Sequence, residues 1–190
     1  MRYFKDQILF ILRFRYLNRF VSFFRKGLYL LAGMNVGKKT LLPKMYVNWP
    51  NRVSIGNRCL LEPGIILKID GIWRAEKAIK IGDDVFIGSN CEFNVRGNVK
   101  IGNDCLVASG CRFIDHDHGT SLDTIMRNQH GHEMPIEIGC DVWLGCNVIV
   151  LKGVIIGNGA IVAAGSVVTK AIPENEIWAG VPAKKIKDRS

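Results

Sequence analysis

Aliphatic residues recur at every sixth position through the C-terminal third of the chain. The position four residues after each of them is small or aliphatic as well. The first set is Ile138, Leu144, Val150, Ile156, Val162 and Val168, and the second is Val142, Val148, Val154, Ala160, Ser166 and Ile172. Neither an α-helix nor a simple hairpin sheet has a period of six. The pattern therefore predicts short strands joined by turns.

The same period is present earlier in the chain, with one change of register. Its earlier members are Ile55, Leu61, Ile81, Ile87, Phe93 and Val99, and it restarts two residues later at Ile101, Val107 and Phe113. A six-residue repeat is typical of a hexapeptide β-helix, in which three units close one triangular coil and each coil contacts only its neighbours. We therefore predict an all-β fold, a left-handed parallel β-helix with the aliphatic residues inside.

Three segments fall outside the repeat. Residues 1–40 form an N-terminal arm, and residues 114–135 must leave the coils as an extruded loop. The tail after Pro173 is expected to be a loop followed by a short C-terminal helix. The predicted organisation is a basic amphipathic helical arm over 1–40 and a β-helix domain over 41–190.

The arm is expected to be helical over residues 4–31. Its apolar positions recur at spacings of four and three and draw one stripe: Phe10, Phe14, Leu17, Val21, Phe24, Leu28 and Leu31. We expect this helix either to pack on the protein's own trimer or to lie on an anionic cytoplasmic leaflet through residues 1–32. Arg13, Arg15 and Arg19 interrupt the apolar run, which argues against a spanning helix and a signal peptide.

The charge of the chain is concentrated in the arm. Residues 1–39 hold nine Lys or Arg and one acid, whereas the formal net charge of the whole chain is +9. The β-helix domain is therefore nearly neutral, which argues against a nucleic-acid partner. The six cysteines without a secretory leader indicate a reducing compartment, so we expect a cytoplasmic protein. Four of them, Cys59, Cys91, Cys105 and Cys111, occupy the small position and are expected to be buried.

All four histidines of the chain lie in the extruded loop, at His116, His118, His130 and His132. A sugar hydroxyl is a poor nucleophile, and an imidazole can take its proton as it attacks a thioester. Asp115 or Asp117 could orient the ring. Two alternatives remain open, namely solvated loop histidines and a zinc site built from the same loop.

Two sequence blocks resemble the hexapeptide-repeat O-acetyltransferases. One is Met134-Pro-Ile-Glu-Ile-Gly139 with Asp141-Val-Trp-Leu-Gly145, and the other is Gly165-Ser-Val-Val-Thr-Lys-Ala-Ile-Pro173 with Ala179-Gly-Val-Pro-Ala183. The similarity is to the branch that contains galactoside and maltose acetyltransferases and the capsule and O-antigen polysaccharide acetyltransferases. It covers roughly residues 50–187.

The resemblance implies roles for individual residues. It implies His116 as the catalytic base with His118 as the second choice. It implies acceptor contacts from Asn94 and Trp143, to which we add Asp115 from its place in the loop. The coenzyme contacts it implies are Trp143, Cys146, Ala164, Thr169, Lys170 and Lys187.

The expected function follows from the resemblance and the loop histidines together. It is acetyl-CoA-dependent O-acetylation of a sugar hydroxyl, probably within polysaccharide or lipopolysaccharide biosynthesis, by a homotrimer that needs no metal. The alternatives are N-acetylation of an amino sugar, a zinc protein like the γ-type carbonic anhydrases, and a non-catalytic trimeric scaffold.

Overall fold

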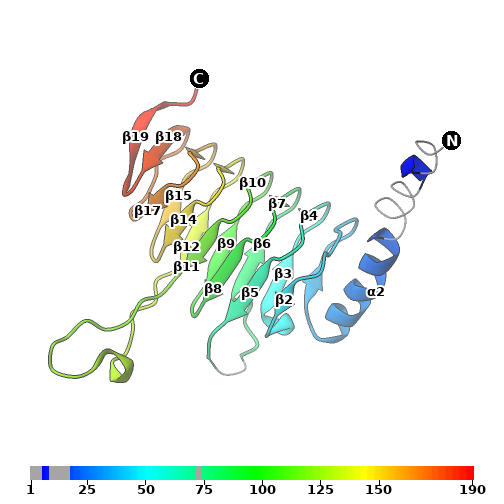
Figure 1. Ribbon diagram of the computed structural model, residues 1–190, viewed down its shortest axis with the longest axis horizontal. Coiled ribbons are helices and arrows are strands. Elements are labelled where there is room, and N and C mark those ends of the chain that lie inside the picture. The colour runs from blue at the N-terminus through cyan, green and yellow to red at the C-terminus, as the bar shows by residue number, and fades with distance from the viewer. Residues whose placement is uncertain (1–5, 9–17, 72–73) are drawn as a thin grey trace.

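The structure, a computed structural model, describes residues 6–8, 18–71 and 74–190. Three parallel sheets wind into a left-handed β-helix (Figure 1). Sheet A contains β1 (Asn35–Val36), β3 (Val53–Ile55), β6 (Ile79–Ile81), β9 (Val99–Ile101), β12 (Ile136–Ile138) and β15 (Ile155–Ile156). Sheet B contains β4 (Leu60–Leu61), β7 (Phe86–Ile87), β10 (Leu106–Val107), β13 (Trp143–Leu144), β16 (Ile161–Val162), β18 (Glu176–Gly180) and β19 (Ala183–Asp188). Sheet C contains β2 (Tyr46–Val47), β5 (Ile66–Ile69), β8 (Glu92–Val95), β11 (Arg112–Ile114), β14 (Ile149–Leu151) and β17 (Val167–Val168).

The predicted β-helix is confirmed, and the period of six places its core. Every member of the two sets from Ile138 to Ile172 is buried, from the aliphatic first positions to Ser166 among the small ones. Phe93 and Phe113 stack in the middle of the column with their ring centroids 4.6 Å apart. Each coil therefore contributes the same inward positions, and the hydrophobic core is one continuous column.

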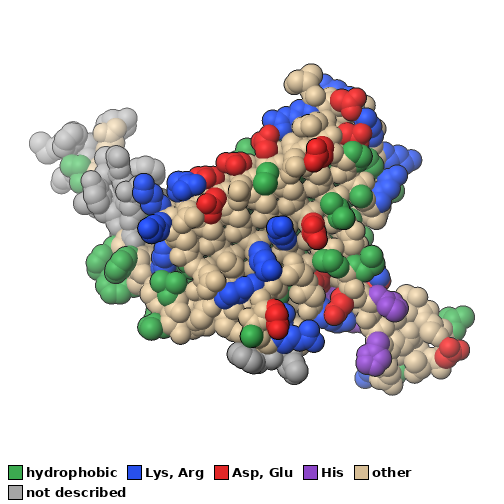
Figure 2. All heavy atoms as spheres, turned by 180° about the vertical axis from the view of Figure 1, so that it is seen from behind, with side chains coloured by type: hydrophobic (Ala, Val, Ile, Leu, Met, Phe, Trp, Pro, Cys, Tyr) green, Lys and Arg blue, Asp and Glu red, His purple; other side chains and the backbone are tan. Residues whose placement is uncertain are grey.

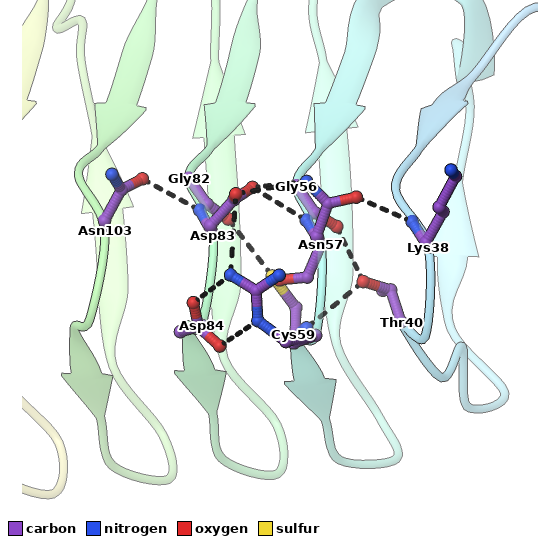
Figure 3. Close-up of polar contacts among 10 residues, drawn as sticks. Lys38, Thr40, Gly56, Asn57, Cys59, Gly82, Asp83, Asp84 and Asn103 are labelled. Carbon is purple, nitrogen blue, oxygen red and sulfur yellow. Dashed lines mark hydrogen bonds and ion pairs between the residues drawn. The ribbon is translucent and has the colours of Figure 1, made fainter.

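The edge between sheets A and B is held by a ladder of polar side chains (Figure 3). The backbone N–H of Lys38 donates to the side chain of Asn57 at 2.8 Å, the N–H of Asn57 donates to Asp83 at 2.8 Å, and the N–H of Asp83 donates to Asn103 at 2.9 Å. The backbone N–H of Asn57, followed by its side-chain amide, lowers the pKa of Asp83. Successive coils are thus tied together at a turn where strand hydrogen bonds stop.

Glycines on this edge let the coils stack at strand spacing. A Cβ added to Gly102 would lie 2.5 Å from the carbonyl oxygen of Gly139 on the next coil. No side chain of any size fits such a gap without moving the backbone. The preference for glycine after the strands of sheet A is therefore a consequence of coil stacking rather than of turn conformation.

The predicted short C-terminal helix is wrong. The tail forms an antiparallel hairpin of β18 and β19, and β18 continues sheet B by pairing Ile177 with Ile161 and Trp178 with Val162. Pro182 lies between the two strands and has no N–H for a helical hydrogen bond. The hairpin also buries Trp178 and Ala183, so it covers the end of the core.

The N-terminal helix is confirmed in its second half, as α2 (Asn18–Leu31). It ends at Gly33, whose φ of 86° suits a glycine, and the N–H of Met34 returns to the carbonyl of Tyr29. Residues 9–17 of the predicted helix lie outside the described residues. Among the described helices, none has the length and apolar character that crossing a bilayer requires. The first strand, β1, lies within the range predicted for the arm.

The loop between β11 and β12 leaves the prism as predicted (Figure 1). It contains one short 3-10 helix, η3 (Met126–Asn128), and a second, η2 (Pro50–Arg52), precedes β3. The base of the loop is a short antiparallel ladder, in which His116 pairs with Glu133 and the N–H of Met134 donates to the carbonyl of Asp115 at 2.9 Å. The residues next to β11 are therefore held by the coils.

Candidate active site

The candidate site lies on the edge of the prism where the strands of sheet C end. Asp115 and His116 follow β11 directly, at the point where the chain leaves the coil for the extruded loop. Asp115 is fully buried, and the side chain of His116 is 8% exposed. This position combines a rigid scaffold with an opening to solvent, which suits a residue that must meet a substrate in a fixed geometry.

Three N–H groups converge on the carboxylate of Asp115. Its Oδ1 accepts the backbone N–H of Arg96 at 2.8 Å and lies 3.0 Å from Nδ1 of His116, while its Oδ2 accepts the N–H of Gly97 at 2.8 Å. Arg96 and Gly97 follow β8 on the preceding coil. The stacking of coils thus supplies the donors that a buried carboxylate requires.

This carboxylate fixes the tautomer of His116. Because an ionised carboxylate accepts only, Nδ1 of His116 carries the hydrogen, and Nε2 is left with its lone pair. The Nε2 atom faces away from Asp115, toward Asp70. An imidazole held in this way can take a proton at Nε2 while Asp115 stabilises the resulting cation.

Sequence reasoning missed Asp70. It follows β5, two coils before His116, and its Oδ2 lies 3.7 Å from Nε2 of His116. Lys68 contacts the same carboxylate at 3.2 Å, and the side chain of Asp70 is about one third exposed. No local motif marks this residue, because its meeting with His116 depends on the stacking of β5, β8 and β11.

The other histidines of the loop are exposed: His118, His130 and His132. Asp117 does not orient His116. It contacts Lys152 and accepts the backbone N–H of His132 at 3.1 Å, and the hydrogen bond from Lys152 is the main reason that the pKa of Asp117 is lowered. Of the two acids considered for orienting the ring, Asp115 alone is in contact with it. The geometry therefore favours His116 over His118 as a base.

Asn94 lies on the outer face of sheet C near this edge. It is paired in register with Ile114, two residues before His116, and Nζ of Lys68 donates to its Oδ1 at 3.4 Å. Asn94, Lys68 and Asp70 thus form a polar strip beside His116. The placement is compatible with the acceptor contact that the resemblance implies for Asn94.

The residues implied as coenzyme contacts are not gathered in one chain. Cys146 and Ala164 lie on successive coils at the edge between sheets B and C, where the N–H of Gly165 donates to the carbonyl of Cys146 at 2.8 Å. Thr169 follows β17, on the same edge as His116 but two coils further along. Trp143 points outward from sheet B and is 51% exposed. Within one chain, Trp143 and His116 therefore lie on different faces of the prism.

The two implied phosphate contacts lie at the C-terminal end. Nζ of Lys170 lies 5.4 Å from the ring centroid of Trp178, and Lys187 is exposed on β19, where its Cα pairs with Ile177. Both ammonium groups are on the last coil and its hairpin. They are compatible with charge-assisted contacts to phosphate at that end of a bound coenzyme.

The predicted burial of four cysteines is confirmed for Cys59, Cys91, Cys105 and Cys111. Burial raises the pKa of Cys105 to about 11 and also raises the pKa of Cys59. These thiols pack as small apolar groups and are poor nucleophiles. Among the described residues, no group of three or more His, Cys, Asp or Glu is arranged to hold a metal ion. The zinc alternative therefore gains no support from the loop histidines.

Family profiles match two parts of the β-helix. Residues 135–170 match "Bacterial transferase hexapeptide (six repeats)", and residues 78–112 match "Hexapeptide repeat of succinyl-transferase". The repeat is of the transferase hexapeptide type. Comparison with curated proteins by sequence gives no match. The narrower branch of galactoside and capsule acetyltransferases stays a prediction.

Solved structures share the whole fold. The chain resembles AntD, an N-acyltransferase from Bacillus cereus in complex with dTDP and 3-hydroxybutyryl-CoA, with a TM-score of 0.74 and 22% identity over 87% of this chain and 88% of AntD. It also resembles the hexapeptide-repeat acetyltransferase VCA0836 from Vibrio cholerae, with a TM-score of 0.66 and 27% identity over 89% of this chain and 81% of VCA0836. VCA0836 has also been solved with acetyl coenzyme A, and that structure gives a TM-score of 0.62 at 25% identity over 87% of this chain and 76% of that one.

Proposed function

We propose that this protein is an acetyl-CoA-dependent acyltransferase that acetylates a sugar, with His116 as its general base. The observation that carries the proposal is the pair formed by Asp115 and His116 on the edge of a transferase-type hexapeptide helix. The buried carboxylate orients the imidazole, and Nε2 faces the surface on which an acceptor could lie. The solved relatives that bind acyl-CoA or acetyl-CoA support the choice of cosubstrate.

The proposed reaction is a direct transfer. Nε2 of His116 takes the proton of the acceptor as its oxygen or nitrogen attacks the thioester carbonyl. The C–S bond then breaks, and the imidazolium returns the proton to the departing CoA thiolate. Asp115 stabilises the imidazolium between these two steps through the hydrogen bond to Nδ1. Atoms and charge balance without a metal or a redox partner.

The acceptor in the main proposal is a sugar hydroxyl, on a precursor of a cell-surface polysaccharide or lipopolysaccharide made in the cytoplasm. Asn94 and the exposed part of Asp70 are placed to accept or donate hydrogen bonds to such a sugar. The coenzyme would run from Thr169 and Lys170 toward His116, along the edge that these residues share. Lys187 would meet its phosphates.

A homotrimer is part of the proposal. The outer positions of sheet B form an apolar row in strand register: Leu60, Phe86, Leu106, Trp143, Ile161 and Ile177. Leu60, Leu106 and Trp143 are each about half exposed in a single chain. A second copy seated on this row would bury it, and it would bring Trp143 and Cys146 of one chain toward the His116 edge of another.

A second candidate function is N-acetylation of an amino sugar, and Asp70 is the observation that favours it. An amine substrate arrives largely as an ammonium ion, and a carboxylate 3.7 Å from Nε2 of His116 can hold that charge beside the base. The same carboxylate offers a neutral hydroxyl only a hydrogen bond. AntD, an N-acyltransferase of the same fold, carries its own acceptor as a dTDP-linked sugar.

A screen of acceptors tests both candidates. Purified protein is given acetyl-CoA and matched pairs of sugars that carry a hydroxyl or an amine at the same position, and released CoA thiol is measured. We expect turnover with one class and a loss of roughly 10²- to 10⁴-fold in His116→Ala. Acetyl-CoA binding, measured by calorimetry, should be nearly unchanged in that variant.

The matched control is His118→Ala, which removes an exposed imidazole from the same loop. Its turnover should stay close to that of the parent protein. A large loss in His118→Ala with normal turnover in His116→Ala would move the base to His118. Binding of acetyl-CoA without transfer to any sugar would support the scaffold alternative instead.

A further inference from the structure

Helix α2 is attached to the β-helix by its polar side. The hydroxyl of Ser22 accepts the N–H of Leu42 at 2.8 Å, Nη1 of Arg25 donates to the carbonyl of Leu42 at 2.7 Å, and the hydroxyl of Tyr29 donates to the carbonyl of Met45 at 3.3 Å. Ser22 is only 4% exposed. These contacts close the first coil and satisfy its backbone groups. They also fix which face of α2 turns away from the protein.

The face that turns away is apolar. Its exposed side chains, with their fractional exposures, are Phe20 at 62%, Phe23 at 74%, Phe24 at 56%, Leu28 at 69% and Leu31 at 88%. The ring of Phe24 packs edge-on against those of Phe20 and Phe23, at centroid distances of 4.8 and 5.8 Å. We call these five residues the outer face of α2. An amphipathic helix of a soluble domain usually buries such a stripe, and here the described residues leave it uncovered.

The outer face lies at one end of the prism and is surrounded by positive charge. Figure 2 shows hydrophobic and basic side chains gathered at the helix end of the molecule. Lys38, Lys39 and Lys44, in the turns of the first coil, are exposed. Residues 1–39 carry nine basic residues and one acid. Aromatic and aliphatic residues beside a dense positive charge match the composition of helices that lie in a membrane interface.

We propose that the outer face of α2 docks the protein on an anionic lipid bilayer, with the axis of the β-helix leading away from the membrane. The structure gives this inference independently of acyl transfer. The five outer side chains carry no hydrogen-bonding group, which suits acyl chains better than a protein surface, whose interfaces average about one hydrogen bond per 100–200 Å². The basic residues complement anionic headgroups.

The location of the helix also favours a lipid surface over a second copy of the chain. Subunit contact is already provided for by the apolar row of sheet B, on the side of the prism. In a trimer with parallel axes, three copies of α2 lie at the same end, so all three outer faces meet one plane together. A planar bilayer can accept all three at once, and the trimer would then gain avidity.

Flotation of the full chain with lipid vesicles tests the proposal. The vesicles contain either phosphatidylcholine alone or phosphatidylcholine with about 30% phosphatidylserine, an anionic fraction that gives a membrane-like surface potential. The test variant is Phe20→Asp, Phe24→Asp and Leu28→Asp combined. The control combines Leu122→Asp, Ile125→Asp and Met126→Asp, which makes the same charge change at three exposed apolar residues of the extruded loop.

We expect the parent protein and the loop control to float with anionic vesicles, and to float less in high salt. The test variant should lose at least about 100-fold in partitioning, since each buried Phe or Leu contributes roughly tenfold or more. An alanine version of the same triple, which changes no charge, should fall in the same direction. Circular dichroism checks that all variants are folded.

Two results would overturn the proposal. If the parent protein does not float, or if the test variant floats as well as the loop control, lipid does not cover the outer face. If the test variant changes the mass of the assembly in solution, as measured by light scattering, the face is an interface between copies of the chain.

Discussion

The substitution Asp115→Asn removes one charge from the candidate site and leaves its shape unchanged. The carboxylate accepts three N–H groups, from Arg96, Gly97 and His116. An amide has one oxygen in place of two. If that oxygen faces Arg96 and His116, the new amide nitrogen meets the N–H of Gly97, and two donors oppose each other in a fully buried position.

Two magnitudes follow from this geometry. One buried N–H left without an acceptor costs about 1–3 kcal/mol in the free energy of unfolding. The loss of the carboxylate also removes the charge that stabilises the imidazolium of His116 during proton transfer. We expect kcat to fall roughly 10²- to 10⁴-fold, which corresponds to about 3–5 kcal/mol in the transition state.

The assay is release of CoA thiol at saturating acetyl-CoA with the best acceptor from the screen. Asp117→Asn is the matched control, because Asp117 is an acid of the same loop that contacts Lys152 rather than His116. Its kcat should stay within about threefold of the parent value, as expected for an exposed ion pair. A kcat for Asp115→Asn equally close to the parent value would refute the role given to the pair.

Three further predictions concern coil stacking, acid stability and assembly. Gly102→Ala should lower the free energy of unfolding by about 1–3 kcal/mol or more in chemical denaturation, because its Cβ would lie 2.5 Å from the next coil, whereas Gly27→Ala, with nothing within 4 Å, should be neutral or stabilising. The pKa of Asp83 is lowered in the fold by the hydrogen bonds from Asn57, so its contribution is present above the unfolded pKa and is lost as the pH falls through the folded pKa; Asp83→Asn should therefore show less loss of stability below about pH 4 than the parent protein. Leu106→Lys, at the centre of the apolar row of sheet B, should shift the assembly toward monomer in sedimentation, and an unchanged mass would remove that row from the interface.

The period of six made most of the fold predictable, because each inward residue meets the same surroundings in every coil. Phe113 and Ile136 bound the extruded loop, which was predictable because it has no phase in the repeat. The C-terminal hairpin was not predictable on these grounds. After Pro173 the repeat ends, and the run of lysines before Arg189 gives no alternation that distinguishes a strand from a helix.

The candidate site was predictable in part. The neighbours Asp115 and His116 could be named because they share a local motif. Asp70 could not, because its contact with His116 joins residues two coils apart and depends on the register of sheet C. The side of α2 that faces the coils was equally hidden. The sequence shows that the helix has an apolar stripe, and only the hydrogen bonds of Ser22 and Arg25 decide where that stripe points.

A crystal structure of the assembled protein with coenzyme A would test the central claim most directly. We predict that the coenzyme sulfur lies within about 4 Å of Nε2 of His116, in the range from which a proton can be passed directly or after a small movement. The pantetheine arm should then follow the edge that leads to Thr169 and Lys170. A sulfur bound on another edge, out of reach of His116 in every copy of the assembly, would contradict the account.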